Sequence, residues 1–173
     1  MGKCKVCGKT TMGNYEFCMN CKPKSANPPS SGGYSTGYKG GSSRGVPPEC
    51  IFKDSFYEAD GYLKKEIFMD AAEKMATIFQ AESMTQTSIR HLFNMLKAIE
   101  MRMKTNRDLP LGFIRENFYK FVTHTEYQTK RAVIKDVFRD FVESHSDIAV
   151  KNKNEFRGFV QYLTAIVARM KQK

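Results

Sequence analysis

The sequence predicts an all-α fold, a five-helix bundle preceded by a small Cys4 zinc-ribbon module on a flexible linker. Three observations carry this prediction. Two Cys-x-x-Cys pairs lie within the first 21 residues, Gly, Ser and Pro dominate residues 22–48, and apolar residues recur at helical spacing from about residue 55. We therefore place the module at residues 1–24, the linker at residues 25–54 and the bundle at residues 55–173.

The module is defined by two cysteine pairs that are separated by ten residues. Four thiolates at this spacing are the ligand set of a tetrahedral structural zinc site, so we predict that Zn²⁺ is bound by Cys4, Cys7, Cys18 and Cys21. The residues between the pairs can form one small hairpin but cannot bury a core, so the metal would hold the module together. Two disulfides are the alternative. A polar, basic start without a signal peptide and the odd thiol of Cys50 argue against them.

The linker prediction rests on residues 22–48, whose only aliphatic side chains are Ala26 and Val46. Such a segment cannot bury enough apolar surface to offset its ordering entropy, so we expect a flexible tether. The tyrosines and basic residues within it can stack on single-stranded bases, or they are simply solvated linker residues.

The bundle prediction rests on apolar residues that follow the spacing of amphipathic helices, while no segment alternates at period two. N-cap chemistry at Ser83-Met-Thr-Gln separates the first helix from the second, and Asp108-Leu-Pro110 breaks the chain after the second. The fourth helix is expected to end near Ser144-His-Ser-Asp147. The apolar positions of the five helices are, in order, Tyr62, Ile67, Ala71, Met75, Ile78 and Phe79; Ile89, Leu92, Phe93, Leu96, Ile99 and Met103; Ile114, Phe118, Phe121 and Val122; Val133, Ile134, Val137, Phe138, Phe141 and Val142; and Phe156, Phe159, Val160, Leu163, Ile166, Val167 and Met170.

The charge balance points to a polyanionic partner. The formal net charge is +10 and the pI is near 9.4, which favours nucleic acid. Residues 1–48 hold seven Lys and Arg against Glu16 alone, whereas residues 49–173 hold 21 basic and 17 acidic groups, so the excess is local. No apolar run is long enough to cross a bilayer, and we expect a cytoplasmic protein with no membrane partner.

No sequence pattern calls for an enzyme. A four-cysteine site leaves no open position for water, and no phosphate loop, Gly-x-Ser-x-Gly or His-Glu-x-x-His motif occurs. The three histidines, His91, His124 and His145, lie on separate segments and are expected at the surface or at its boundary. Asp136 and Asp140 alternate with basic residues and predict a solvated, salt-bridged face.

The second helix carries the most informative basic pattern. Arg90, Lys97 and Lys104 are seven residues apart, close to two turns, so they form one stripe away from the core positions. Lys130 and Arg131 are expected to open the fourth helix and to extend this stripe. We predict that these five residues contact a nucleic-acid backbone, which gives affinity without sequence reading. A solvated polar face is the alternative.

Two segments resemble a known family. SMTQTSIRHLFNMLKAIEMRM is similar to the Ile-Arg helix of the small α-helical subunit of type III-A CRISPR (Csm) effector complexes, and NEFRGFVQYLTAIVARMK is similar to that family's C-terminal helix. The likeness covers about residues 65–173. Two departures stand out: Arg169-Met170-Lys171 replaces the usual end of the last helix, and the family has no counterpart of residues 1–48.

The resemblance implies a non-catalytic subunit of an RNA-guided interference complex. Members stack in several copies along the guide RNA–target RNA duplex, beside the backbone and large subunits. By position, Arg90 matches an RNA-facing residue of the family, and Lys130 and Arg131 fall near a basic position. The module at residues 1–24 would then dock on a neighbouring subunit or touch RNA.

Two functions of other classes stay open on the sequence alone. One is a free-standing zinc-ribbon nucleic-acid-binding accessory factor whose helical bundle dimerises, for which residues 1–48 in isolation should bind nucleic acid in a salt-sensitive way. The other is an adaptor that grips a protein, for which a stoichiometric partner and no RNA are expected. Co-purified guide RNA with several larger subunits distinguishes the complex subunit from both.

Overall fold

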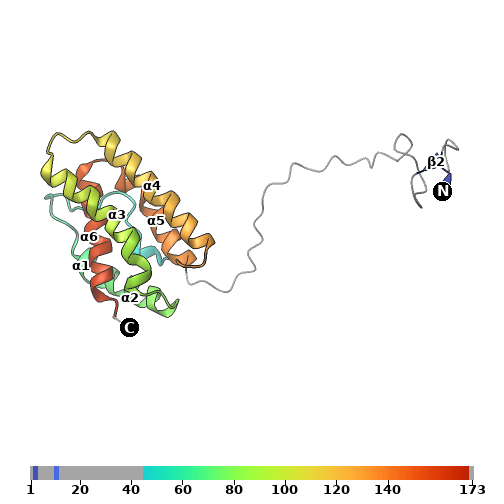
Figure 1. Cartoon of the computed structure of the whole chain (residues 1–173). Helices are drawn as coiled ribbons and strands as arrows, with labels where there is room; N and C mark the ends of the chain where they lie inside the picture. Colours follow the sequence, from blue (N-terminus) through green and yellow to red (C-terminus); the bar gives the residue numbers. More distant parts are fainter. Residues whose placement is uncertain (1, 4–9, 12–44, 172–173) are drawn as a thin grey trace. The chain divides into compact units, whose positions relative to one another are not determined.

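A computed structural model describes residues 2–3, 10–11 and 45–171 of the chain (Figure 1). The chain divides into two compact units, Met1–Lys39 and Gly40–Lys173. In the first unit, β1 (Gly2–Lys3) pairs antiparallel with β2 (Thr10–Thr11). Thr10–Thr11 belongs to the stretch for which a hairpin was predicted, but its partner strand precedes the first cysteine pair. The predicted zinc ligands themselves lie outside the described residues.

From residue 45 to residue 171 the chain is helical apart from turns, loops and one β-bridge between Tyr57 and Leu63. A 3₁₀ turn η1 (Pro48–Cys50) and a one-turn helix α1 (Lys65–Phe68) come first. Five long helices follow, which confirms the predicted bundle: α2 (Asp70–Ala81), α3 (Gln86–Thr105), α4 (Leu111–Lys130), α5 (Asp136–Ala149) and α6 (Lys153–Arg169). None of the helices in this range is both long and apolar enough to span a bilayer.

Helix α6 occupies the centre of the bundle. It packs against α1, α2, α3 and α5, while α4 packs against α3 and α5 (Figure 1). Phe118, Phe121, Phe141 and Phe159 are fully buried and join the helices through ring contacts of 5.5 to 6.4 Å. Burial of each such ring contributes about 1.5–3 kcal/mol, so the aromatic positions predicted from periodicity form the main source of stability.

The breaks on either side of α3 are confirmed. The Thr85 side chain caps the helix by accepting from the backbone N–H of Ser88, and the Ser88 hydroxyl accepts in return from the N–H of Thr85. At the other end α3 stops at Thr105, and Pro110 precedes the first residue of α4. These two ends fix α3 as a helix of 20 residues.

Helices α2 and α4 both end in a Schellman motif without glycine. Ser83 follows α2 with φ of 60°, and Ala132 follows α4 with φ of 57°. In each case the paired backbone bonds of the motif are present, for example Val133 N–H to Gln128 C=O at 3.1 Å and Ala132 N–H to Thr129 C=O at 2.8 Å. The left-handed residue therefore carries a Cβ, which costs conformational energy at both ends.

The segment 46–57, which we term the strap, is anchored on the bundle although its first residues were assigned to the linker. Cys50 and Phe56 are fully buried and Phe52 is 8% exposed. Glu155 of α6 accepts from the Ser55 hydroxyl at 2.6 Å and from the Phe56 N–H at 2.9 Å. The linker thus ends before residue 46, because the aromatic side chains that follow it are buried against α5 and α6.

Gly158 of α6 makes this close approach possible. A Cβ at Gly158 would lie 2.6 Å from the Cβ of Phe56, which is closer than side chains pack. The prediction that Tyr62 belongs to the apolar face of the first helix is wrong. Tyr62 is 75% exposed and lies in the loop before α1, because the long helix begins only at Asp70.

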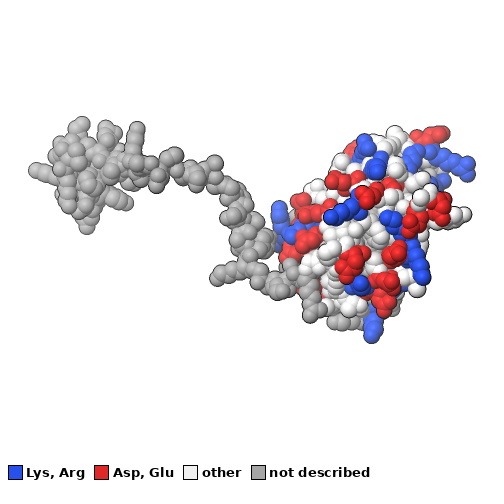
Figure 2. All heavy atoms as spheres, turned by 180° about the vertical axis from the view of Figure 1, so that it is seen from behind, with Lys and Arg blue, Asp and Glu red and all other residues white. Residues whose placement is uncertain are grey.

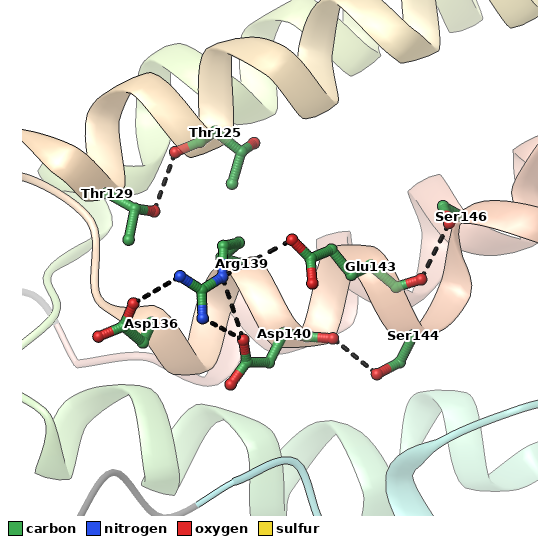
Figure 3. A network of polar contacts seen from close by, with 8 residues as sticks. All are labelled: Thr125, Thr129, Asp136, Arg139, Asp140, Glu143, Ser144 and Ser146. Carbon is green, nitrogen blue, oxygen red and sulfur yellow. Dashed lines mark hydrogen bonds and ion pairs between the residues drawn. The ribbon is translucent and has the colours of Figure 1, made fainter. Parts of the chain in front are cut away.

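The predicted end of the fourth helix near Ser144 is also too early. Helix α5 continues to Ala149 because Ile148 and Ala149 remain buried on its apolar side. The serine hydroxyls stay compatible with the helix by donating to preceding carbonyls, Ser144 to Asp140 at 2.6 Å and Ser146 to Glu143 at 2.9 Å (Figure 3).

Candidate nucleic-acid interface

The predicted basic stripe lies on the side of α3 that faces α6. Arg90 and Lys104 are exposed and Lys97 is half-buried, while the core positions Leu92 and Leu96 point into the bundle as predicted. Helix α3 runs antiparallel to α6, because Gln86 near its start donates to Val167 and Met170 near the end of α6. The stripe therefore borders the seam between the two helices.

A buried carboxylate joins two of the three cations. Glu100 is 4% exposed, and its oxygens contact Lys97 Nζ at 2.7 Å, Lys104 Nζ at 3.5 Å and Gln161 Nε2 at 3.2 Å. Burial alone would raise the pKa of Glu100, but the hydrogen bond and charge of Lys97, and then those of Lys104, outweigh it and lower the pKa. Glu100 is consequently ionised at neutral pH, and the cluster of these three charges has a net charge of +1.

Sequence reasoning missed the effect of Glu100. Its spacings of three residues from Lys97 and four from Lys104 are the spacings at which helical side chains pair, so the signal was present. Lys97 also lies over the Phe93 ring, 5.7 Å from its centre. Two of the predicted contact residues are thus held in place by intramolecular partners, whereas no hydrogen bond or ion pair to another described residue engages the Arg90 side chain.

Lys130 and Arg131 do not open a helix. Lys130 is the last residue of α4 and Arg131 is its C-cap, because α4 runs on through the buried Thr125. Both side chains are exposed, and the Arg131 guanidinium lies 5.4 Å from the centre of the Tyr127 ring. This end of α4 lies beside the N-terminal half of α3.

The pairing of α3 with α4 brings two histidines together. The rings of His91 and His124 lie 4.9 Å apart, although the sequence places them on separate segments. Within residues 45–171, no three His, Cys, Asp or Glu side chains lie close enough together to hold a metal ion. The expectation of a surface position fails for His145, which is fully buried among aromatic rings.

Charge is divided unevenly among the elements. Residues 86–131, which form α3 and α4, hold nine Lys and Arg against four Asp and Glu, and residues 151–171 hold five against one. Residues 45–85 hold four Lys and Arg against eight Asp and Glu, and residues 132–150 hold two basic against four acidic residues. The basic excess of the described bundle is therefore carried by α3, α4 and α6, and α3 packs against both of the other two helices. The opposite view shows acidic and basic side chains interspersed (Figure 2).

The predicted salt-bridged face on α5 is confirmed and is acidic overall. Arg139 contacts Asp136 at 2.8 Å, Asp140 at 2.7 Å and Glu143 at 3.6 Å (Figure 3). The hydrogen bond and charge of Asp140 raise the pKa of Arg139 most. One cation among three carboxylates leaves this face negative, so it is a poor place for a phosphate backbone.

A small helical bundle whose basic excess lies on three adjoining helices belongs to the class of proteins suited to holding a polyanion. The comparison with protein families makes this specific. The family model for Csm2 of type III-A matches residues 63–172, and the chain belongs to this family of small subunits of type III-A CRISPR Csm complexes. No curated protein and no solved structure matches the chain. Membership places the chain in a complex with other Csm subunits and RNA.

Proposed function

We propose that this Csm subunit is non-catalytic and cytoplasmic, and that several copies stack along the guide RNA–target RNA duplex and contact its backbone. The observation that carries the proposal is the basic excess on α3, α4 and α6, and above all the stripe of Arg90, Lys97 and Lys104 on α3 beside the seam with α6. Lys130 and Arg131 add two exposed cations at the end of α4.

The ion pairs with Glu100 are compatible with backbone binding. An ammonium group has three donors, and Glu100 occupies one on each lysine, so donors remain for phosphate oxygens. Lys104 keeps 59% of its side chain exposed and Lys97 keeps 36%. Glu100 then acts as the group that holds the two ammonium ions in fixed positions at the surface.

Arg157 of α6 is a further contact residue that the sequence reasoning did not single out. It lies one turn from Gln161, the residue of α6 that donates to Glu100, and its Nε is buried without a partner among the described residues. The half-buried Arg157 thus adds a cation on α6 one turn from the cluster, although its Nε itself is shielded from solvent.

The experiment replaces Arg90, Lys97 and Lys104 by Ala in the full chain and measures binding to the guide RNA–target RNA duplex as a function of salt. Each lost phosphate contact should lower the slope of log K against log salt by about 0.7–0.9. The matched control replaces Lys53, Lys65 and Lys74, three exposed lysines of the acidic segment, and changes the net charge equally. Equal losses in the two triple variants, or none in the first, would contradict the proposal.

We further propose that residues 1–24 bind one structural Zn²⁺ through Cys4, Cys7, Cys18 and Cys21. The cysteine spacing supports this, and so does the antiparallel β1–β2 pair, whose connection contains the first cysteine pair. The metal content of the purified chain tests it. One zinc per chain that is lost on replacement of the four cysteines by Ser is expected, and a chain purified without metal would contradict it.

A further inference from the structure

The outward side of α4 carries an aromatic surface that the basic stripe does not use. We call it the α4 face; it consists of Glu116, Tyr119, Lys120, Thr123, His124 and Tyr127. Steps of three and four residues place all six on one side of the helix, away from the buried Phe118 and Phe121. They line a shallow hollow of about 580 Å³.

Two tyrosines leave large aromatic areas open to solvent on this face. Tyr119 and Tyr127 are each 53% exposed, and neither hydroxyl has a hydrogen-bond partner within residues 45–171. They are eight residues apart, a distance of about 12 Å along the helix, so each ring has room for a separate ligand group. Unlike the isolated Tyr62, these two rings share one side of a helix, so together they offer a pair of stacking positions.

The charges around these rings are three cations against the two carboxylates Glu116 and Glu126, a small excess that favours a polyanion. Arg131 lies 5.4 Å over the Tyr127 ring, Lys130 is exposed next to it, and Lys120 pairs with Glu116 at 2.6 Å. The two helices that form this part of the surface, residues 86–131, hold nine basic groups against four acidic ones. Planar guanidinium and phenol groups side by side are the combination on which unpaired bases stack, with cations for the phosphates.

We propose that the α4 face binds unpaired nucleotides of RNA, with bases stacked on Tyr119 and Tyr127 and phosphates held by Lys130 and Arg131. The ligand is single-stranded because base faces inside a duplex are already covered by their neighbours. The inference rests on the proposed function in that it presumes an RNA-facing subunit, but it assigns a different ligand to a second surface, which meets the first at Lys130 and Arg131. The α3 stripe holds the duplex backbone, and the α4 face holds nucleotides outside the duplex.

The test measures the affinity of the full chain for a labelled single-stranded RNA of about 12 nucleotides and for a duplex of the same length. Replacement of both Tyr119 and Tyr127 by Ala should weaken single-strand binding about tenfold or more and leave duplex binding unchanged. Replacement of both by Phe keeps the rings and should retain the affinity. The control is Tyr62→Ala, which removes the 75% exposed tyrosine before α1 and should change neither.

Three results would overturn the inference. Unchanged single-strand binding by the double Ala chain removes the stacking surface, and equal loss in the Phe and Ala chains assigns the contacts to the hydroxyls. A loss of self-association on sedimentation, without loss of single-strand binding, makes a second copy of the chain the occupant. Failure of the proposed function is seen separately, as absence of duplex binding by the unmodified chain.

Discussion

Acidification should weaken the bundle through the buried His145. Its Nε2 accepts from the Phe52 N–H at 3.2 Å, so the ring proton resides on Nδ1, which donates to the Phe141 carbonyl at 2.7 Å. Five aromatic rings surround it with centres 4.7 to 6.2 Å away. Burial lowers the pKa of His145, and the hydrogen bond to the Phe141 carbonyl offsets this only in part.

The sign and size of the effect follow from this lowered pKa. In the unfolded chain His145 takes up a proton near pH 6.5, whereas the folded chain keeps it neutral to lower pH, so the unfolded state binds more protons between these two values. Stability is fully present above about pH 6.5 and falls by about 1.4 kcal/mol for each pH unit below it, until the folded pKa is reached. Between about pH 7.5 and pH 5.5 we expect a loss of up to about 1.4 kcal/mol from this residue.

Urea unfolding followed by circular dichroism at these two pH values measures the loss. The comparison chain is His145→Gln, which cannot take up the proton, and His124→Gln serves as the control because it removes a half-buried histidine. The difference in unfolding free energy between the wild type and His145→Gln should shrink by up to about 1.4 kcal/mol on acidification. An unchanged difference would refute the reasoning, as would a wild-type His145 imidazole whose NMR signal titrates near pH 6.5.

Three further predictions concern packing, helix ends and the buried carboxylate. Gly158→Ala should lower the unfolding free energy by about 1–3 kcal/mol, because the new methyl group displaces Phe56, and an increase would show that the strap moves aside freely. Ala132→Gly and Ser83→Gly should each stabilise the chain by about 0.5–1 kcal/mol, because glycine adopts the left-handed conformation without strain. A lower midpoint temperature of thermal unfolding in either variant would contradict this. Glu100→Gln should cost about 1 kcal/mol at neutral pH; the difference should shrink as pH falls below the unfolded pKa of about 4.3 and vanish only below the lower pKa of the folded chain, where the wild-type carboxyl is protonated as well, and a cost that persists there would assign it to packing.

Periodicity was sufficient to predict the bundle. The apolar face of α3 was found because Ile89, Leu92 and Leu96 repeat at the spacing of one helix side, and the capping residue Thr85 is of the expected type. The end of α4 was harder to place because Ala132 stands where glycine is the usual signal. For the same reason Lys130 and Arg131 were assigned to the start of a helix rather than to the end of one.

The strap and the candidate interface depend on contacts that no local pattern reveals. Phe56 meets Glu155 and Gly158 across about a hundred residues, and a short irregular segment has no repeat that indicates its buried side. The stripe on α3 was predicted from spacing, but its pairing with Glu100 and Gln161 requires α6 beside it. The α4 face was missed because Tyr119 and Tyr127 belong neither to the predicted apolar positions of this helix nor to the basic stripe.

The strap also sets an order of events when the polypeptide is made. Its partners His145 and Glu155 lie 93 and about 100 positions further along, so they leave the ribosome long after Phe52 and Phe56 do. Until then these two rings have no site to occupy and stay open to water or to a chaperone. A nascent product that stops short of the last helix therefore carries exposed aromatic groups next to residues 1–44, and its removal by proteases would depend on that exposure.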